Sequence, residues 1–319
     1  MGRERMAYLE LGKGSISILP WTSSGLHICA RRRAPVPVAP VKRTLLPALA
    51  ALSLAACGEP APSKLPVDAA PSASAVAAPA IDAPAAPAAS VAVPPAVRAI
   101  VDAPDRSDAD RALDAGRHPA ELRAFFGIAP GMKVAELGAG GGYTAELLAR
   151  AVGPAGVVYG QNNKFIVERF AQKPWGERLA KPIMKNVVRV DREFDDPLPA
   201  EARDLDAVFM VLFYHDTVWM ETDRARMNSA VFKALKPGGV FAIIDHSGRA
   251  GTGATETKTL HRIDEAVVKK ELEAAGFKLG GEAAFLRNAS DTRDWNDAPG
   301  AAADKRGTSD RFVLRFVKP

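Results

Sequence analysis

Strand-like and helix-like patterns of apolar residues alternate along the chain from about residue 99 to its end. Apolar runs of strand length occupy Lys133–Leu137, Gly156–Gly160, Asn186–Val190, Leu205–Phe213 and Val240–Ile244. The fourth of these runs is almost unbroken, which is typical of a strand buried on both faces of a sheet. Helical spacing follows at Pro119–Phe126, Tyr143–Val152, Met227–Leu235 and Asp264–Ala275.

Strands that alternate with helices indicate parallel strands joined by right-handed crossovers, with helices on both faces of the sheet. Near the C-terminus, Arg311–Val317 alternates apolar and polar residues, which favours an antiparallel edge strand. The polar stretch Asn288–Thr308 contains Pro299-Gly300 and is predicted to be a surface loop. The fold class expected is therefore α/β, with a doubly wound, mostly parallel sheet and an antiparallel edge strand.

The N-terminal third has a different pattern. Lys42-Arg43 precedes the apolar run Leu45–Ala56, and Leu54-Ala-Ala-Cys57 ends it. A short basic segment, about a dozen apolar residues and small residues at the end are typical of a secretory signal, and the run is too short to span a bilayer. The ending resembles a bacterial lipobox, in which Cys57 is lipidated and becomes the first residue of the mature protein.

From Gly58 to about Arg98 the chain is rich in alanine and repeatedly interrupted by proline, which predicts a semi-extended tether without a core. Three regions follow: an N-terminal extension with a signal peptide (1–56), the tether (57–98) and a folded domain (99–319). Gly58 after the cysteine favours the outer membrane, so we expect a lipid-anchored domain on its periplasmic face. Cys29 and Cys57 are the only cysteines, so the folded part has no internal disulfide.

The formal charge of +5 does not indicate a nucleic-acid partner. Residues 1–56 carry eight of the 42 Lys and Arg residues but only two of the 37 Asp and Glu residues. The remainder of the chain is close to neutral, so the basic excess belongs to the signal region.

A glycine-rich loop, Gly138-Ala-Gly140-Gly-Gly142, stands between a predicted strand and a predicted helix. Such a loop lets the backbone approach a ligand closely, beside the free N–H groups of a helix N-terminus. A dinucleotide fold would add an acidic residue after the second strand, where this chain has Gln161-Asn162. S-adenosylmethionine is the competing cofactor, because Glu136 places a carboxylate where its ammonium group would lie.

Several motifs together resemble the class I S-adenosylmethionine-dependent methyltransferases. The quoted segments are Glu136-x-Gly138-x-Gly140-x-Gly142, the apolar fourth strand ending in Tyr214-His215, and Leu235-Lys-Pro-Gly-Gly239. More narrowly, Arg117–Glu121, Phe213–Asp216, Asp245–Ser247 and Thr257–Arg262 resemble a group of bacterial methyltransferases without an assigned acceptor. The resemblance spans roughly residues 105–319 and implies a seven-stranded Rossmann-like sheet.

The resemblance also implies roles for individual residues. Those implied to bind the cofactor are Glu136, Gly138, Gly140, Gly142, Gln161, Asn162 and Glu193. Gln161 or Asn162 would bind the ribose hydroxyls through an amide, where most members use an acid, and Glu193 would reach the adenine.

Candidate residues on the acceptor side end the fourth and fifth strands. They are Tyr214, His215, Asp216 and His246. Because neighbouring parallel strands deliver their ends to one rim, the two histidines are expected in one pocket, where either could act as a base. His261 and Trp219 are candidates for lining it. A metal site formed by His215, Asp216, Asp245 and His246 is conceivable, but no close-spaced ligand motif supports it, so the sequence predicts no metal site.

Three functions remain open from the sequence. The first is a methyltransferase that uses S-adenosylmethionine and acts on a small molecule or an envelope component. The second is a non-catalytic, lipid-anchored binding protein that keeps the fold, and the third is an NAD(P)-dependent oxidoreductase. Acceptor pockets in such folds are built from variable loops, so the sequence does not name the acceptor.

Overall fold

The protein is described by a computed structural model that places residues 91–319. The lipobox at Cys57 and most of the predicted tether lie outside these residues. The predicted boundary at residue 98 falls inside a helix that begins at Pro95, so the folded part starts a few residues earlier than expected. Pro95 stands in the first turn, where a missing N–H costs nothing.

The described chain contains a single seven-stranded sheet in the order β3-β2-β1-β4-β5-β7-β6. The strands are β1 Lys133–Leu137, β2 Val157–Asn162, β3 Val187–Asp191, β4 Leu205–Val211, β5 Leu235–His246, β6 Lys278–Ala283 and β7 Arg311–Val317. The helices are α1 Pro95–Val101, α2 Asp108–Arg117, α3 Pro119–Phe126, α4 Tyr143–Val152, α5 Lys164–Ile166, α6 Gln172–Leu179, α7 Asp216–Trp219, α8 Arg224–Ala234, α9 Thr257–Leu260 and α10 Glu265–Ala274. A π-helical turn, Val167–Ala171, joins α5 to α6, and short 3₁₀ turns lie at Pro182–Met184 and Ala303–Lys305.

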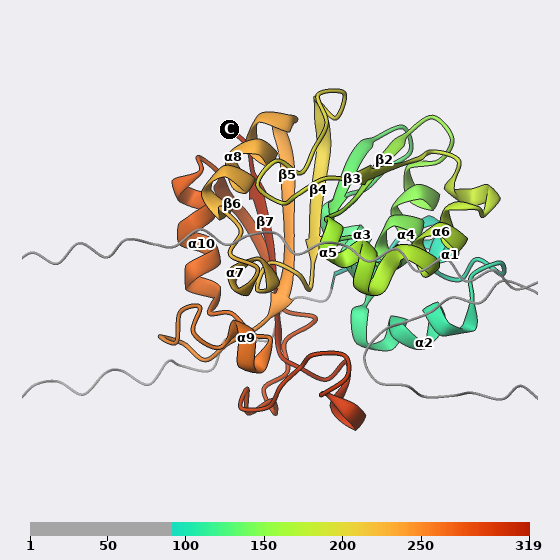
Figure 1. Ribbon diagram of the computed structural model, residues 1–319. Coiled ribbons are helices and arrows are strands. Elements are labelled where there is room, and N and C mark those ends of the chain that lie inside the picture. Colours follow the sequence, from blue (N-terminus) through green and yellow to red (C-terminus); the bar gives the residue numbers. More distant parts are fainter. Residues whose placement is uncertain (1–90) are drawn as a thin grey trace, which may run out of the picture. The chain divides into compact units, whose positions relative to one another are not determined.

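The doubly wound α/β prediction is confirmed. Helices α3, α4 and α6 cover one side of the sheet and α7, α8 and α10 the other (Figure 1). Central strands β1, β4 and β5 are buried along most of their length, as expected for strands covered on both faces. No helix within residues 91–319 is long and apolar enough to cross a membrane.

The antiparallel strand predicted at Arg311–Val317 is present, but its place in the sheet differs from the expectation. Strand β7 pairs antiparallel with β5 on one side and with β6 on the other, so β6 is the edge. The edge strand Lys278–Ala283 was not predicted, because Gly280-Gly281 interrupts its apolar alternation.

Local sequence explains several helix boundaries that position the site. Asp264 caps α10 by accepting a hydrogen bond from the backbone N–H of Ala266, and Ser107 caps α2 in the same way. Gly127 ends α3 in the left-handed region at φ +69°, which only glycine adopts without strain. Strands β1, β4 and β5 are parallel neighbours, so the β1–α4 loop and the carboxyl ends of β4 and β5 lie at one rim of the sheet.

Candidate active site

A cavity of about 890 Å³ opens at the carboxyl ends of the parallel strands. Its wall joins the glycine loop after β1, the segment after β4, the end of β5 and the polar loop before β7. Parallel sheets of this kind bind ligands at this edge, and the volume is of the size that small-molecule sites have.

The structure requires glycine at the three motif positions for different reasons. Gly138 and Gly140 line the cavity, whereas Gly142 does not. At Gly140 an added Cβ would meet no atom within 4 Å, so the loop leaves open space where a ligand can approach the backbone. At Gly142 a Cβ would lie 2.2 Å from the buried ring of Trp175, so that glycine serves packing, not cofactor contact.

Gln161 and Asn162 brace the glycine loop and do not line the cavity. The Gln161 Oε1 accepts the N–H of Gly138 at 3.0 Å, and its Nε2 donates to the carbonyl of Arg192 at 2.6 Å. Asn162 binds both backbone groups of Gly140, through Oδ1 at 2.7 Å and Nδ2 at 3.1 Å. Both amides bind backbone groups of the loop and its surroundings, so their geometry does not support the predicted ribose role.

Glu193 also departs from its predicted place. It is exposed, does not line the cavity, and accepts hydrogen bonds from the Lys164 N–H and the Asn163 amide, both at 3.3 Å. Its carboxylate thus holds the start of α5, which does not support the predicted adenine contact.

Glu136 does face the cavity, as the sequence predicted. Its side chain is buried, and one carboxylate oxygen, Oε2, has no hydrogen-bond partner. Burial raises the pKa of Glu136 to about 8, although Thr144, Arg117 and the N–H of Ala145 act in the opposite direction. A buried carboxylate oxygen without a partner is costly unless a ligand supplies a donor.

The expectation that His215 and His246 share a pocket is confirmed. Both line the cavity, and their ring centroids are 5.5 Å apart. Asp245 at the end of β5 connects them: its carboxylate bonds His215 Nδ1 and the backbone N–H groups of both histidines, at 2.7–2.8 Å. Asp245 belongs to the Asp245–Ser247 motif, but its role between the two histidines was not predicted from the sequence.

The two histidines differ in electrostatics. Burial lowers the pKa of His215, but the carboxylates of Asp245 and Asp216 outweigh burial and raise it to about 10. Burial lowers the pKa of His246, against the opposing effect of Asp297. The Nδ1 atom of His246 is engaged by Ser309 at 2.9 Å and by Asp297, which leaves Nε2 for a ligand.

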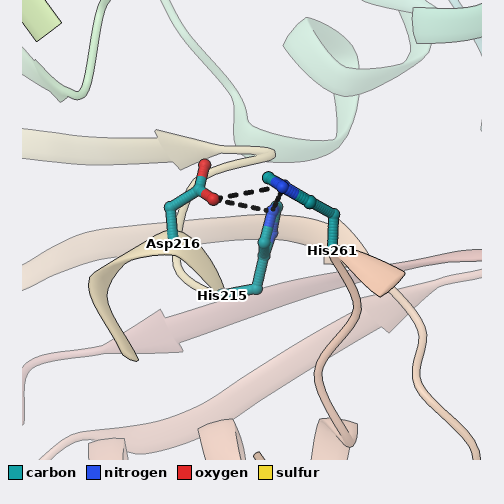
Figure 2. A group of neighbouring side chains, drawn as sticks. All are labelled: His215, Asp216 and His261. Atoms are coloured by element: carbon teal, nitrogen blue, oxygen red, sulfur yellow. Dashed lines mark hydrogen bonds and ion pairs between the residues drawn. The ribbon is translucent and has the colours of Figure 1, made fainter. Parts of the chain in front are cut away.

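Asp216 and His261 complete a compact cluster with His215 (Figure 2). His215 Nε2 lies 3.1 Å from His261 Nδ1 and 3.2 Å from Asp216 Oδ1, and the last two atoms are 3.3 Å apart. Trp219 donates its indole N–H to the same oxygen at 2.6 Å. All four side chains line the cavity.

Tyr214 lies outside the cavity wall, which does not support its predicted catalytic role. The side chain is fully buried away from the cavity, donates its hydroxyl to Glu271 of α10 at 2.7 Å and accepts from Asn228 of α8 at 2.9 Å. Burial, reinforced by the Glu271 carboxylate, raises the pKa of Tyr214. Tyr214 therefore ties the strand end to the helices behind it.

Two features of the cavity wall were missed by sequence reasoning. Phe165 and Phe170, both exposed, form edge-to-face aromatic contacts that continue to Trp219 at the cavity wall. Asp297, in the loop predicted to lie on the surface, is buried against His246. For the aromatic wall, the only signal in the sequence was the pair of aromatic residues Phe165 and Phe170 after the second strand. For Asp297 there was none, because no spacing pattern links it to His246.

Arg117 adds a half-buried cation to the cavity wall. Its guanidinium lies over the Tyr143 ring, 4.5 Å from the centroid. Burial lowers its pKa, with Tyr143 and Glu136 acting in the opposite direction. A planar guanidinium at this place can bind a ligand carboxylate in a bidentate manner.

Comparison with known proteins gives a similarity of fold. No protein-family model matches the chain. A S-adenosylmethionine-dependent methyltransferase from Aquifex aeolicus is 20% identical, with 70% of this chain and 98% of that chain covered and a TM-score of 0.46. A S-adenosylmethionine-dependent methyltransferase from Mesorhizobium loti is 18% identical, with 65% of this chain and 100% of that chain covered and a TM-score of 0.44. Aeropyrum pernix fibrillarin with bound S-adenosylmethionine is 14% identical, with 60% of this chain and 68% of that chain covered and a TM-score of 0.40.

Proposed function

We propose that this protein is a S-adenosylmethionine-dependent methyltransferase. The observation that carries the proposal is the unpartnered, buried Oε2 of Glu136 in the same cavity as the open backbone at Gly140. A ligand with an ammonium group satisfies the first feature, and a ligand that approaches the loop closely fills the second. The cofactor would supply a methyl group activated as a sulfonium.

The residues fit the rest of the amino-acid end of such a cofactor. The N-terminus of α4 follows the glycine loop directly, and its free N–H groups favour a carboxylate. Arg117 is the nearby cation of the wall. The amide braces from Gln161 and Asn162 hold the loop in shape before a ligand arrives, which reduces the ordering cost of binding.

On the acceptor side, the protein would contribute mainly by orienting the acceptor atom toward the methyl group of the cofactor. In-line methyl transfer gains mainly from holding two reacting atoms in line. The cavity wall combines a polar group, His215, Asp216, His246 and His261, with an adjoining aromatic group, Phe165, Phe170 and Trp219. This combination suits a small acceptor with an apolar body and one heteroatom to be methylated.

Titration calorimetry of the full chain tests the proposal. We expect one S-adenosylmethionine per chain and no binding of NAD, because the unpartnered oxygen of Glu136 suits an ammonium group, which NAD lacks. Incubation with labelled cofactor and a metabolite extract then identifies the methylated product by mass spectrometry. Absence of cofactor binding would overturn the proposal, and binding without transfer would favour the non-catalytic alternative.

We further propose that the domain is carried on a lipid anchor at Cys57, on the periplasmic face of the outer membrane. The support is the sequence Lys42-Arg43, the apolar run Leu45–Ala56 and the Leu-Ala-Ala-Cys ending. The Ala/Pro-rich stretch after it has the composition of a spacer.

A further inference from the structure

The rim of the cavity carries three side chains of the types that bind transition metals. His215 and Asp216 follow β4, and His261 comes from the segment after α9, 46 residues later in the chain. Figure 2 shows the three side chains converging from these two segments. We propose that His215, Asp216 and His261 bind one divalent transition-metal ion, with open coordination positions toward the cavity.

The spacing of the ligand atoms fits one ion. Two ligands about 2.0–2.1 Å from a metal and about 90–110° apart are about 2.9–3.4 Å from each other. The three distances here, 3.1 Å between the imidazole nitrogens and 3.2 and 3.3 Å from them to Asp216 Oδ1, all lie in this interval. The three atoms therefore outline one face of a tetrahedral or octahedral site.

The surroundings orient these ligands as outer-shell partners do in metalloproteins. Asp245 accepts a hydrogen bond from His215 Nδ1 at 2.7 Å, so Nε2 is the ring nitrogen that faces the cluster, where a metal ion would take the place of its proton. Trp219 donates to Asp216 Oδ1 at 2.6 Å and fixes the carboxylate. Asp245 and Asp216 also make the immediate surroundings negative, which favours a cation.

Ligand chemistry selects the class of metal. Two imidazoles and one carboxylate suit Zn²⁺ or Fe²⁺, whereas Mg²⁺ and Ca²⁺ prefer oxygen ligands alone. Three protein ligands leave at least one position open, as in sites that bind a substrate. Because all three side chains line the cavity, that position faces the space that an acceptor would occupy.

The consequence for substrate class rests on the proposed methyltransferase function. The acceptor would carry a hydroxyl, a carboxylate or a thiol that coordinates the ion through its oxygen or sulfur. Its apolar body would then lie against Phe165 and Trp219. Metal binding itself does not depend on the methyltransferase proposal.

Zinc binding is measured first on the full chain carrying Cys29→Ser and Cys57→Ser, so that thiolates do not contribute. Equilibrium dialysis with metal quantification is expected to give one Zn²⁺ per chain. His261→Asn is the test variant, because His261 has φ 52° and asparagine tolerates this left-handed region. Its affinity should fall by more than the about 10–100-fold that loss of an outer-shell partner costs.

His118→Asn is the matched control. His118 also has a left-handed backbone, at φ 46°, but does not line the cavity, so its substitution should leave zinc affinity unchanged. Circular dichroism verifies folding. If His261→Asn does not fold, Asp216→Asn replaces it, since an amide oxygen can still accept the Trp219 N–H.

Co²⁺ provides a readout without activity. Its visible absorption should show bands of a low-coordinate site, and azide should shift them if a position is open to the cavity. Substoichiometric zinc, or equal affinities in His261→Asn and His118→Asn, would overturn the metal proposal. S-adenosylmethionine titration of chelator-treated protein tests the methyltransferase proposal separately, so each can fail alone.

Discussion

Replacing Glu136 by glutamine should remove a specific pH dependence from the stability of the protein. Burial raises the pKa of Glu136 from 4.5 to about 8. That rise corresponds to about 5 kcal/mol of preference for the protonated form in the folded state. Glutamine has the same shape and no proton to lose, so the variant isolates this contribution.

The sign follows from proton binding in the two states. Between pH 4.5 and about 8 the unfolded chain has lost this proton and the folded chain keeps it. Stability contributed by the protonated form is therefore complete below pH 4.5 and is lost as pH rises toward 8, at about 1.4 kcal/mol per pH unit. From pH 5.5 to 7.5 the wild type should lose about 2.7 kcal/mol relative to Glu136→Gln.

Denaturant unfolding of both proteins at several pH values measures this difference. All other titrating groups are common to both chains and cancel in the comparison. Parallel stability curves would refute the buried-carboxyl interpretation. The same reasoning predicts that S-adenosylmethionine affinity rises about tenfold per pH unit below pH 7, with one proton released per ligand, because an ammonium group requires the carboxylate.

Three further outcomes are expected. Gly140→Val should abolish S-adenosylmethionine binding. Gly127→Val imposes a similar left-handed strain of about 1–2 kcal/mol away from the cavity, so it should reduce only stability. Equal calorimetric affinities of the two variants would contradict the loop assignment. Tyr214→Phe should lower the free energy of unfolding by about 1–3 kcal/mol with unchanged cofactor affinity, since its hydroxyl binds only Glu271 and Asn228; a lost affinity would return Tyr214 to the site. Cys57→Ser should move the protein from membrane to soluble fractions, and unchanged fractionation would exclude the anchor.

The sequence predicted those parts of the fold that depend on local pattern. The apolar run at Leu205–Phe213 and the glycine loop after Leu137 gave the sheet class and the cavity edge, because burial on two faces and tight turns restrict residue type directly. Strand β6 escaped detection, since Gly280-Gly281 carries no alternation. The place of β7 depends on that strand and could not follow from its own residues.

Side-chain direction explains most of the differences between the predicted and the observed places of the candidate site residues. His215 and Tyr214 are adjacent in sequence, yet one faces the cavity and the other the helices α8 and α10. Gln161 and Asn162 stand at the position expected for a ribose contact, but the loop N–H groups of Gly138 and Gly140 take their oxygens. Such choices depend on which backbone groups lack partners after folding, which one sequence does not reveal.

The position of β7 between β5 and β6 makes one late segment of the chain necessary for a continuous sheet. Strands β5 and β6 come earlier in the chain, and each has one edge that Arg311–Val317 pairs. Until β7 is in place, both edges offer unpaired backbone groups to other strands. A variant with a weakened β7 would keep its glycine loop and histidines but not a continuous sheet, so self-association through the edges of β5 and β6 is the failure to expect of it.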